Sequence, residues 1–494
     1  MTPAERVDDT PTVAVSDAKH TVYPAQAPYD PPERYPELAA GPGGLDPSNH
    51  VYPAVREALR LLGLDAGRYG TAQWNPLGDL VRPGHHVVIK PNLVRHFHGG
   101  GLGVEGLVTH GSVVRAVLDY VLLALKGEGR ITVGDAPLQY SEMPSTMQRS
   151  GLGDVLESAR QGTAVPIRAL DFRKERSEKR DGIIVARVPN NGDPEGYRVV
   201  DLKSKSRFTG MPRQRTERFR VTQYDPSTMA RAHGDTTHAY LIPASVLSAD
   251  VFINVPKLKT HAKAGITGAM KNLVGINGSK DWLPHHTMGA VPDGGDEYLR
   301  RSARKRLVSF LKDRIEGRRG VLPRRTLHFM QRVVRATGKI SAFPDPYWEG
   351  SWHGNDTLWR MVHDLHHVLF YADASGTIRT EPQRGYLAIV DAVVAGEGEG
   401  PMRPTPRPAG LVIAGGNPAA VDIVCCRLMG FDEHKIPLLR QAIGNGHHPG
   451  VASTSSIRVV GAEGPWSRPA ALKRSETLRF APPAGWVGAI EMDD

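Results

Sequence analysis

The chain has very few cysteines, only 2 among 494 residues. They are the neighbours Cys425 and Cys426, so a bond between them would be strained. A four-thiolate zinc site or an iron–sulfur cluster needs more cysteines than the chain contains. Uncharged apolar runs also stay shorter than the ~18 residues of a membrane-spanning helix, and the first residues lack the pattern of a signal peptide. We therefore expect a cytoplasmic protein with no transmembrane segment and no iron–sulfur cluster.

Positive charge is concentrated in one segment. Residues 298–335 contain 13 Lys and Arg and two acidic residues, Asp313 and Glu316, so the segment has a net charge of 13 minus 2, or +11. This exceeds the net charge of +10 of the whole chain. The rest is close to neutral, so a nucleic-acid-binding face is not expected. Basic amphipathic helices are predicted over 299–316 and 324–336. The first has an apolar residue at every fourth position: Leu299, Ala303, Leu307, Leu311 and Ile315. We expect these helices to form a lid, with a docking surface as the alternative.

The sequence also lacks the common nucleotide-binding motifs. It contains no GxxxxGK[ST], and no GxGxxG follows the first predicted strand. What recurs instead is a short apolar strand that ends in polar residues and is followed by a helix, as at Lys90 and Asp135. This alternation predicts an α/β fold with a mixed, largely parallel sheet, flanking helices and a basic helical insertion.

The same pattern divides the chain into five parts. We expect an extended N-terminal arm (1–50), the first part of the α/β core (51–290), a basic helical insertion or lid (291–375), the closing part of the core (376–465) and a C-terminal tail (466–494).

Lysines and amides follow several of the predicted strands. Ligands of open α/β sheets bind at the carboxyl ends of the strands, where such residues gather. Compact ammonium groups suit the oxygens of a phosphate or carboxylate, and an imidazole can move a proton near neutral pH. We therefore predict catalytic roles for Lys257, Lys259 and His261. The predicted substrate-binding residues are Lys90, Asn92, Lys271 and Asn272.

Carboxylates and histidines near the same strand ends could hold a divalent metal ion. Glu397 and Glu399 stand two residues apart in GEGEGP, so an extended backbone points both the same way. With Asp135 and His110 they form the predicted metal site. The alternative is a solvated glycine-rich loop and a hydrogen-bonded structural histidine.

Several segments together resemble a known family. They are VVIKPNLV, VTH, GDAP, INVPKLKTH with TGAMKNLVG, VVAGEGEGP and AGGNPAAVD. In order and wording they resemble the family known as domain of unknown function 362, over roughly residues 80–440. Many members carry ferredoxin-like four-iron clusters, whose cysteines this chain lacks. The resemblance implies no settled reaction, but it implies one shared site formed by Lys90, Asn92, Asp135, Lys257, Lys259, His261, Lys271, Asn272 and Asp422.

The leading hypothesis is an enzyme of a bacterial biosynthetic pathway. It would act, with or without a metal ion, on a small anionic substrate that bears a phosphate or a carboxylate. Two alternatives stay open. One is a redox accessory protein that works with a separate iron–sulfur partner, and the other is a non-catalytic protein that binds anions or a membrane surface. The sequence predicts no oligomeric state.

Overall fold

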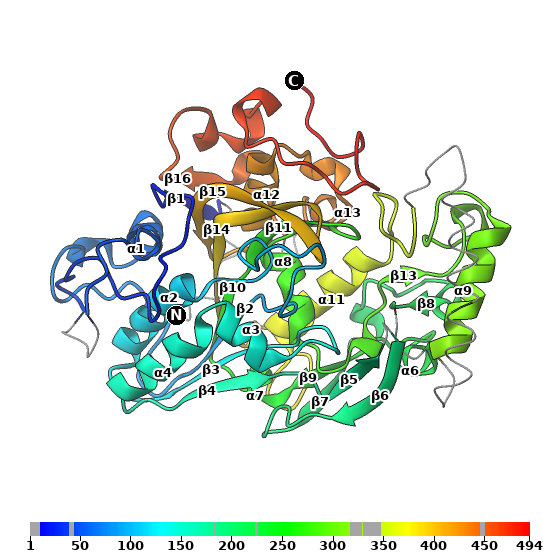
Figure 1. The fold of residues 1–494 in the computed structure, drawn as a ribbon, viewed down its shortest axis with the longest axis horizontal. Helices are drawn as coiled ribbons and strands as arrows, with labels where there is room; N and C mark the ends of the chain where they lie inside the picture. The colour runs from blue at the N-terminus through cyan, green and yellow to red at the C-terminus, as the bar shows by residue number, and fades with distance from the viewer. Residues whose placement is uncertain are drawn as a thin grey trace.

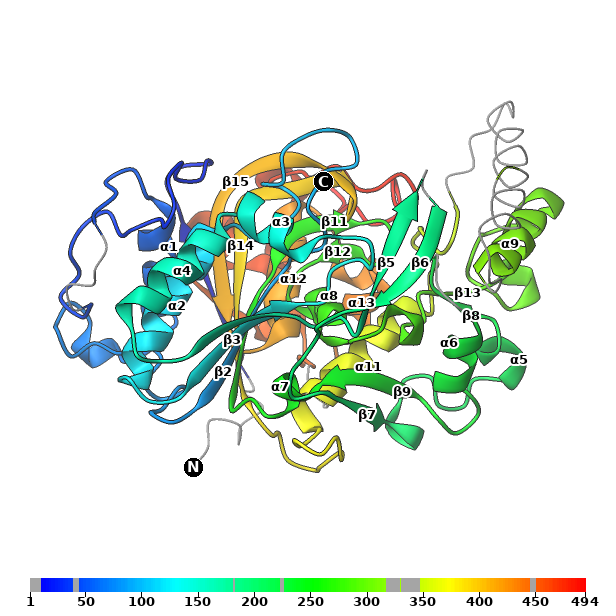
Figure 2. The same cartoon turned by 60° about the horizontal axis from the view of Figure 1, so that its bottom comes forward.

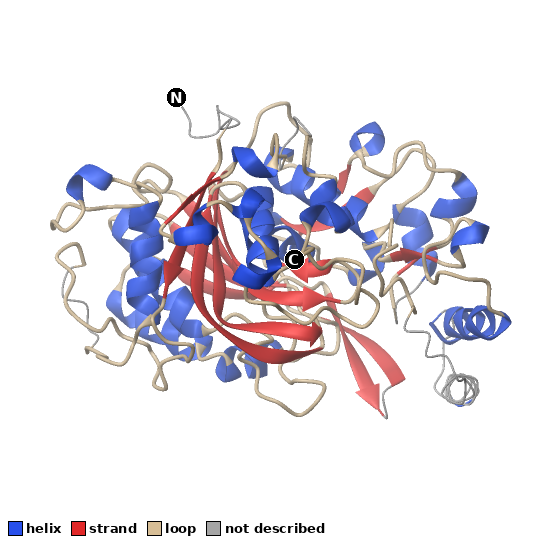
Figure 3. Ribbon diagram, turned by 90° about the horizontal axis from the view of Figure 1, so that it is seen from above, coloured by secondary structure: helices blue, strands red, loops and turns tan. Residues whose placement is uncertain are grey.

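A large sheet with helices on both faces forms the centre of the protein (Figures 1 and 3). The computed structural model describes residues 10–38, 44–180, 183–222, 226–316, 329, 347–444 and 450–494. The strands run in the order β16 (Arg458–Val460), β1 (Thr12–Asp17), β15 (Arg403–Gly415), β14 (Gly385–Glu399), β10 (Val251–Val255), β2 (His86–Pro91), β3 (Arg130–Asp135) and β4 (Ile167–Asp171). Two further strands, β11 (Lys257–His261) and β12 (Gly265–Thr267), continue beside β14.

Most neighbours in this sheet are parallel. The contiguous strands β14, β10, β2, β3 and β4 pair in parallel, whereas β15 is antiparallel to both β14 and β1. Parallel strands need helical crossovers, which the chain supplies on both faces of the sheet. The predicted α/β fold with a mixed, largely parallel sheet is therefore confirmed.

Helices cover the two faces of the sheet unequally (Figure 2). One face packs against α1 (Val51–Leu61), α2 (Gly111–Leu125) and α4 (Leu152–Gly162). The other packs against α8 (Ala269–Asn272), α11 (Leu358–Tyr371), α12 (Pro418–Met429) and α13 (Pro437–Arg440). Of the helices within the described ranges, none has both the length and the apolar character needed to cross a bilayer.

Smaller elements surround this core. The other α-helices within the described residues are α3 (Met143–Arg149), α5 (Arg213–Thr216), α6 (Pro226–Ala232), α7 (Ala244–Leu247) and α9 (Ala303–Glu316). Three two-stranded sheets are formed by β5 (Glu175–Arg180) with β6 (Ile183–Pro189), β7 (Tyr197–Asp201) with β9 (Ala239–Pro243), and β8 (Phe219–Arg220) with β13 (His286–Thr287).

The pleat of the sheet decides which way the polar residues face. In β2, Val87 and Ile89 belong to the core under α1 and α2, whereas Val88 belongs to the core under α11 and α12. Side chains alternate along a strand, so Lys90 faces the same side as Val88. The same alternation in β10 turns Asn254 toward α8. Polar groups thus enter the face on which α8 lies.

The first 50 residues contribute to the sheet. They were expected to form an extended arm, but they contain β1, which lies between β15 and β16. Val13 and Val15 of this strand are buried in the core. The partners of β1 lie about 400 residues further along the chain, so local sequence gives little sign of its burial.

Helix α9 lies at the edge of the molecule (Figure 1), and its buried face differs in part from the predicted apolar stripe. Of the predicted stripe, Leu311 is buried, but Leu307 is 45% exposed. The buried face also carries Val308 and Lys305, whose ammonium donates to the carbonyl oxygen of Tyr347 at 2.6 Å. The predicted second helix, 324–336, lies outside the described residues apart from Phe329.

Helix α8 is held at its start by a carboxylate from another helix. Asp422 of α12 accepts hydrogen bonds from the backbone N–H groups of Ala269 at 2.5 Å and Met270 at 2.9 Å. Asp422 is fully buried, and burial raises its pKa to about 7. Because α8 carries Lys271 and Asn272, the Asp422 carboxylate fixes the position of both.

Replacement of Asp422 by Asn should change how stability depends on pH. The folded-state pKa of Asp422 lies above the unfolded value of ~3.9, so the folded protein retains a proton that the unfolded chain loses. Stability that is present at low pH is therefore lost as the pH rises from about 4 to about 7, by at most about 4 kcal/mol.

This loss should be absent in D422N. We expect urea denaturation at pH 5 and pH 8 to show a smaller difference for D422N than for the wild type, while D79N, at an exposed position, keeps the wild-type difference. Equal pH dependence in D422N and the wild type would contradict this role of Asp422.

Candidate functional site

Two neighbouring parallel strands, β2 and β3, end in a buried ion pair. The Lys90 ammonium lies 2.8 Å from a carboxylate oxygen of Asp135. Lys90 also donates to the side chain of Asn272 and to the carbonyl oxygen of Pro91, each at 3.1 Å. Asp135 in turn accepts the backbone N–H of Leu93 at 2.7 Å. Three acceptors occupy the three N–H donors of Lys90, so this lysine holds the strand ends together.

A chain of amide side chains leads from this pair to Lys259. Asn272 donates to Asn254 at 2.7 Å and accepts a hydrogen bond from Asn92 at 2.9 Å. Asn92 accepts one from the Lys259 ammonium at 2.7 Å, and Lys259 also donates to the carbonyl oxygen of Leu107. Four of the predicted residues thus share one hydrogen-bond network, which includes side chains from β2, β11 and α8: Lys90, Asn92, Asn272 and Lys259.

Lys257 belongs to a second buried ion pair. Its ammonium lies 2.6 Å from Asp391, and both side chains are completely buried. It also donates to the Tyr23 hydroxyl and, at 3.2 Å, to the carbonyl oxygen of Val394. Tyr23 donates in turn to the other oxygen of Asp391 at 2.6 Å. All three N–H donors of Lys257 are therefore used inside the protein, and none is left for a substrate.

His110 packs beside this pair as a neutral ring. It stacks on Tyr23 with ring centroids 4.0 Å apart, and its Nδ1 accepts the backbone N–H of Ser112 at 3.2 Å, which caps α2. Burial, with the nearby charge of Lys257, lowers the pKa of His110 to about 3. The lone pair of Nδ1 is therefore already used in a helix cap.

The four predicted metal ligands have separate partners. Glu397 and Glu399 point the same way, but toward the C-terminal segment, where they accept the backbone N–H groups of Ala481 at 3.0 Å and Ala484 at 2.8 Å. Asp135 pairs with Lys90, and His110 caps α2. Across the described ranges no three His, Cys, Asp or Glu side chains gather as metal ligands would. The structure therefore does not bring these four residues into one site.

Lys271 differs from the paired lysines. Its residue is only 7% exposed, and in the described part of the chain its ammonium has no hydrogen bond and no ion pair. Burial and the charges of Lys280, Lys263 and Lys90 lower its pKa to about 7. A buried cation surrounded by cations is unfavourable unless an anion joins it.

Further basic groups surround Lys271. Burial lowers the pKa of Lys263 to about 8 and, with the charge of Lys90 contributing, that of Lys280 to about 7. Lys263 donates to the carbonyl oxygen of Glu349, and Lys280 to that of Val274 at 3.1 Å. We use the name Lys271 cluster for the following six residues, whose charges act on one another: Lys259, His261, Lys263, Lys271, Lys280 and His285.

The two histidines of the cluster carry their protons on opposite nitrogens. The Nδ1 of His261 accepts the backbone N–H groups of Lys263 at 3.0 Å and Ala264 at 3.2 Å, which places the proton of the neutral ring on Nε2. The Nδ1 of His285 donates to the carbonyl oxygen of Leu283 at 2.8 Å, which leaves Nε2 as an acceptor. Burial and the charge of Lys271 lower both pKa values. One ring therefore offers a donor and the other an acceptor.

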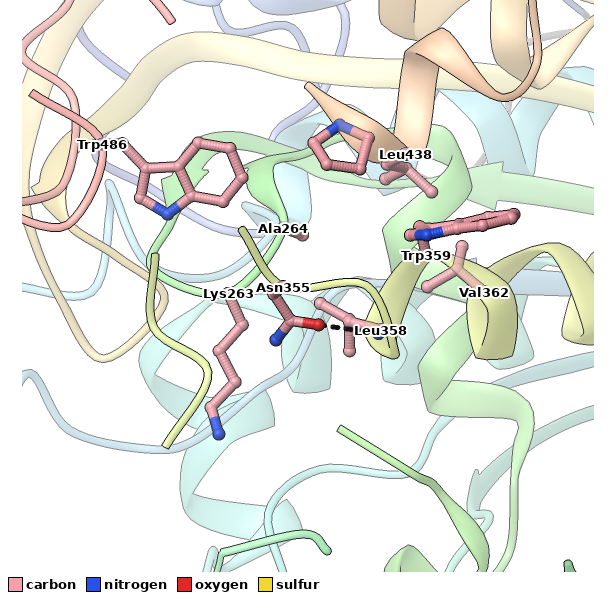
Figure 4. A pocket seen from close by; sticks show the side chains of 9 residues that line it. Lys263, Ala264, Asn355, Leu358, Trp359, Val362, Leu438 and Trp486 are labelled. Carbon is pink, nitrogen blue, oxygen red and sulfur yellow. Dashed lines mark hydrogen bonds between the residues drawn. The ribbon is translucent and has the colours of Figure 1, made fainter. Parts of the chain in front are cut away.

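Apolar side chains support the turn that carries Lys263. Trp486 donates its ring N–H to the carbonyl oxygen of Ala262 at 2.7 Å, and Asn355 accepts the N–H of Leu358 at 2.9 Å. Figure 4 shows the Lys263 side chain extending away from Trp486 and the other apolar groups. The packing behind the turn thus fixes the backbone N–H groups that bind His261.

A surface groove lies elsewhere in the molecule. It encloses about 660 Å³ between α3, α4 and β4, and Met143, Met147, Asp171 and Arg176 are among the residues that line it. None of the predicted site residues lines it. The groove is therefore separate from the buried polar groups at the strand ends.

Removal of Lys257 should destabilise the protein rather than merely weaken ligand binding. In K257M the Asp391 carboxylate would stay buried without its cation, which costs about 3–5 kcal/mol. We expect denaturant unfolding to show this loss, and the double variant K257M/D391N to recover part of it. K205M, at an exposed lysine, serves as the control. Equal stability of K257M and K205M would contradict the structural role of the pair.

Comparison with known proteins gives few matches. One solved structure similar to the chain is the lactate racemase apoprotein from Thermoanaerobacterium thermosaccharolyticum, with 13% identity and a TM-score of 0.27 over 74% of this chain and 52% of that one. The chain thus spans about half the length of that protein, and at this TM-score the likeness does not define a shared fold. No curated protein matches the chain.

A family model does match, over residues 87–189 and 207–427. These two ranges contain the ion pairs, the chain of amide side chains and the Lys271 cluster, and together they cover more than half of the sequence. The protein therefore belongs to the family described as Domain of unknown function (DUF362).

Proposed function

We propose that this protein is an enzyme that binds a small phosphate- or carboxylate-bearing molecule at the Lys271 cluster. The observation that carries the proposal is the Lys271 side chain, which belongs to a residue only 7% exposed, has no hydrogen bond or counter-ion within the described residues, and lies within range of the charges of Lys280, Lys263 and Lys90. A buried charge without a partner costs several kcal/mol, and the oxygens of an anionic ligand can supply that partner.

The type of cation fits a small ligand. Each lysine offers a compact charge and up to three N–H donors, without the planar fork by which arginine selects a two-oxygen partner. Lys259 already points its ammonium at Asn92, which fixes the side chain. A ligand oxygen between Lys259 and Lys271 would therefore meet one cation held in place and one still unpaired.

The two histidines favour an enzyme over a simple anion-binding protein. His261 presents an N–H at Nε2 and His285 presents a lone pair at Nε2, so one ring can donate to a substrate oxygen while the other accepts a proton. Both rings are neutral at pH 7, because burial and the lysines lower their pKa values. Simple binding would not require opposite tautomers.

Anion affinity should depend on Lys271. We expect calorimetric titration with inorganic phosphate, sulfate and acetate to show at least about tenfold weaker binding to K271M, because a hydrogen bond to a charged group contributes about 1.5–3 kcal/mol. K271R should retain most of the affinity, and K205M all of it. Equal affinity of K271M and the wild type, or no binding of any of the three anions, would contradict the proposal.

The affinity should also fall as the pH rises. Lys271 must carry its proton to pair with an anion, and its pKa is about 7. Sulfate keeps its charge over this range, so its affinity should decrease from pH 6 to pH 9, by up to about tenfold per unit once the pH exceeds the pKa of about 7 that Lys271 has in the free protein. Titrations of the wild type at four pH values test this, and an unchanged affinity would contradict it.

A further inference from the structure

We propose that Lys271 is a covalent site, whose amine forms an imine with the carbonyl carbon of a small aldehyde or oxo compound that also carries an anionic group. The inference rests on the proposed function, since the other cations of the Lys271 cluster would hold the anionic group. It goes further by naming the reacting nitrogen and the chemical class of the substrate.

The argument begins with the hydrogen bonds of the lysines. A lysine attacks a carbonyl only through a nitrogen lone pair, so ion pairs and strong hydrogen bonds suppress the reaction. Lys90 and Lys257 each use all three donors in buried ion-paired networks. Lys263 and Lys280 donate to backbone carbonyl oxygens. Lys271 makes none of these contacts within the described ranges, so no acceptor there holds it in the charged form.

The surroundings favour the neutral amine. The charged groups that act on Lys271 are the ammonium groups of Lys280, Lys263 and Lys90, and the imidazoles of His261 and His285 also lie within range of its charge. With a pKa of about 7, close to half of the Lys271 amines are neutral at pH 7. For an ordinary lysine, with a pKa of ~10.4, the neutral fraction is below about one in a thousand.

The histidine tautomers supply the two proton positions that the reaction needs. The N–H at Nε2 of His261 can donate to the carbonyl oxygen as negative charge develops there. The lone pair at Nε2 of His285 can accept the proton that the attacking nitrogen sheds. Lysine, donor and acceptor come from α8, the end of β11 and the segment before β13, and the charge of Lys271 lowers the pKa of both histidines.

The chemistry balances without a further reactant. The Lys271 nitrogen bonds to the carbonyl carbon, and the electron pair of the C=O bond moves to oxygen. A proton passes from nitrogen to that oxygen by way of His285, which gives a carbinolamine. The hydroxyl group then takes up one proton and leaves as water, and the nitrogen lone pair completes the protonated imine.

Reductive trapping tests the inference. Full-length protein is treated with glyoxylate, a small aldehyde that carries a carboxylate, together with cyanoborohydride, which adds hydride to an imine and leaves a carboxymethyl group on the lysine. Peptide mass spectrometry then gives the labelling rate of each lysine. We expect Lys271 to be labelled at least about tenfold faster than exposed Lys205, with a rate that rises with pH and is half-maximal near pH 7.

A substitution that keeps the charge separates binding from covalent chemistry. K271R retains a cation at this position but has no amine that can form an imine, so labelling at position 271 should be lost whatever its sulfate affinity, which is measured in parallel. Its labelling at Lys205 should equal that of the wild type. Thermal unfolding of K271R shows whether it is folded, and if it is not, the labelling map of the wild-type protein decides alone.

The outcomes distinguish the two proposals. If sulfate binds but Lys271 is labelled no faster than Lys205, the imine site is wrong and the anion site stands. If Lys271 is labelled quickly and sulfate does not slow the labelling, the amine is reactive but the shared site is wrong. Fast labelling that sulfate suppresses is the expected result. The two pH dependences also run in opposite directions, since anion binding weakens and labelling accelerates as Lys271 loses its proton.

Discussion

The sheet buries lysine ammonium groups, and its structure depends on the carboxylates that pair with them. Taking a lysine out of water costs several kcal/mol, and only a carboxylate and further acceptors in good geometry offset that cost. Lys90 with Asp135 meets this requirement at the ends of β2 and β3, and Lys257 at the start of β11 meets it with Asp391 inside β14. Each pair also forms hydrogen bonds with the backbone, so the pairs fix the strands at these positions. Lys271 is buried nearby without such a partner among the described residues, which makes it the exception that needs an explanation.

The buried lysines thus differ in whether their N–H donors are used in hydrogen bonds within the described part of the protein. The paired lysines use all their N–H donors within the protein and hold the strands in place. Hydrogen bonds among Asn254, Asn272 and Asn92 extend this network to Lys259. Helix α8 is fixed from behind by α12 and carries Lys271 at its end. A reactive side chain held by a rigid element keeps its position without bonds of its own, which leaves its polar atom free for a ligand.

The sequence predicts the sheet well because its strands carry a local signal. Short apolar runs ending in polar residues mark β2, β3, β10 and β14, and the parallel arrangement follows from the helices between them. The short strand β1 was missed, because its burial depends on partners near the other end of the chain. The buried face of α9 was predicted only in part, for a related reason. Which face of a helix is buried depends on its neighbours in the fold, and here the carbonyl oxygen of Tyr347 accepts a hydrogen bond from Lys305.

The sequence singles out candidate site residues, but their hydrogen-bond partners come from the fold. Lys257 was predicted as catalytic because it follows an apolar strand, and Lys271 as substrate-binding because it lies in a glycine-containing segment. Only the fold shows that Lys257 has three acceptors, whereas Lys271 has no acceptor among the described residues and is affected by the charges of Lys280, Lys263 and Lys90. The tautomers of His261 and His285 likewise depend on backbone groups whose positions no local pattern fixes. Roles of this kind follow from hydrogen-bond partners, which tertiary structure supplies.

The place of β1 bears on how the sheet closes during folding. β1 pairs with β15 (403–415) and β16 (458–460), so these contacts join segments about 400 residues apart in the sequence. Contacts between such distant segments require a long loop of chain to close, which slows their formation. Tyr23, which follows β1 in the chain, completes the Lys257–Asp391 pair. The order of this buried ion pair is therefore coupled to the closure of a long chain loop.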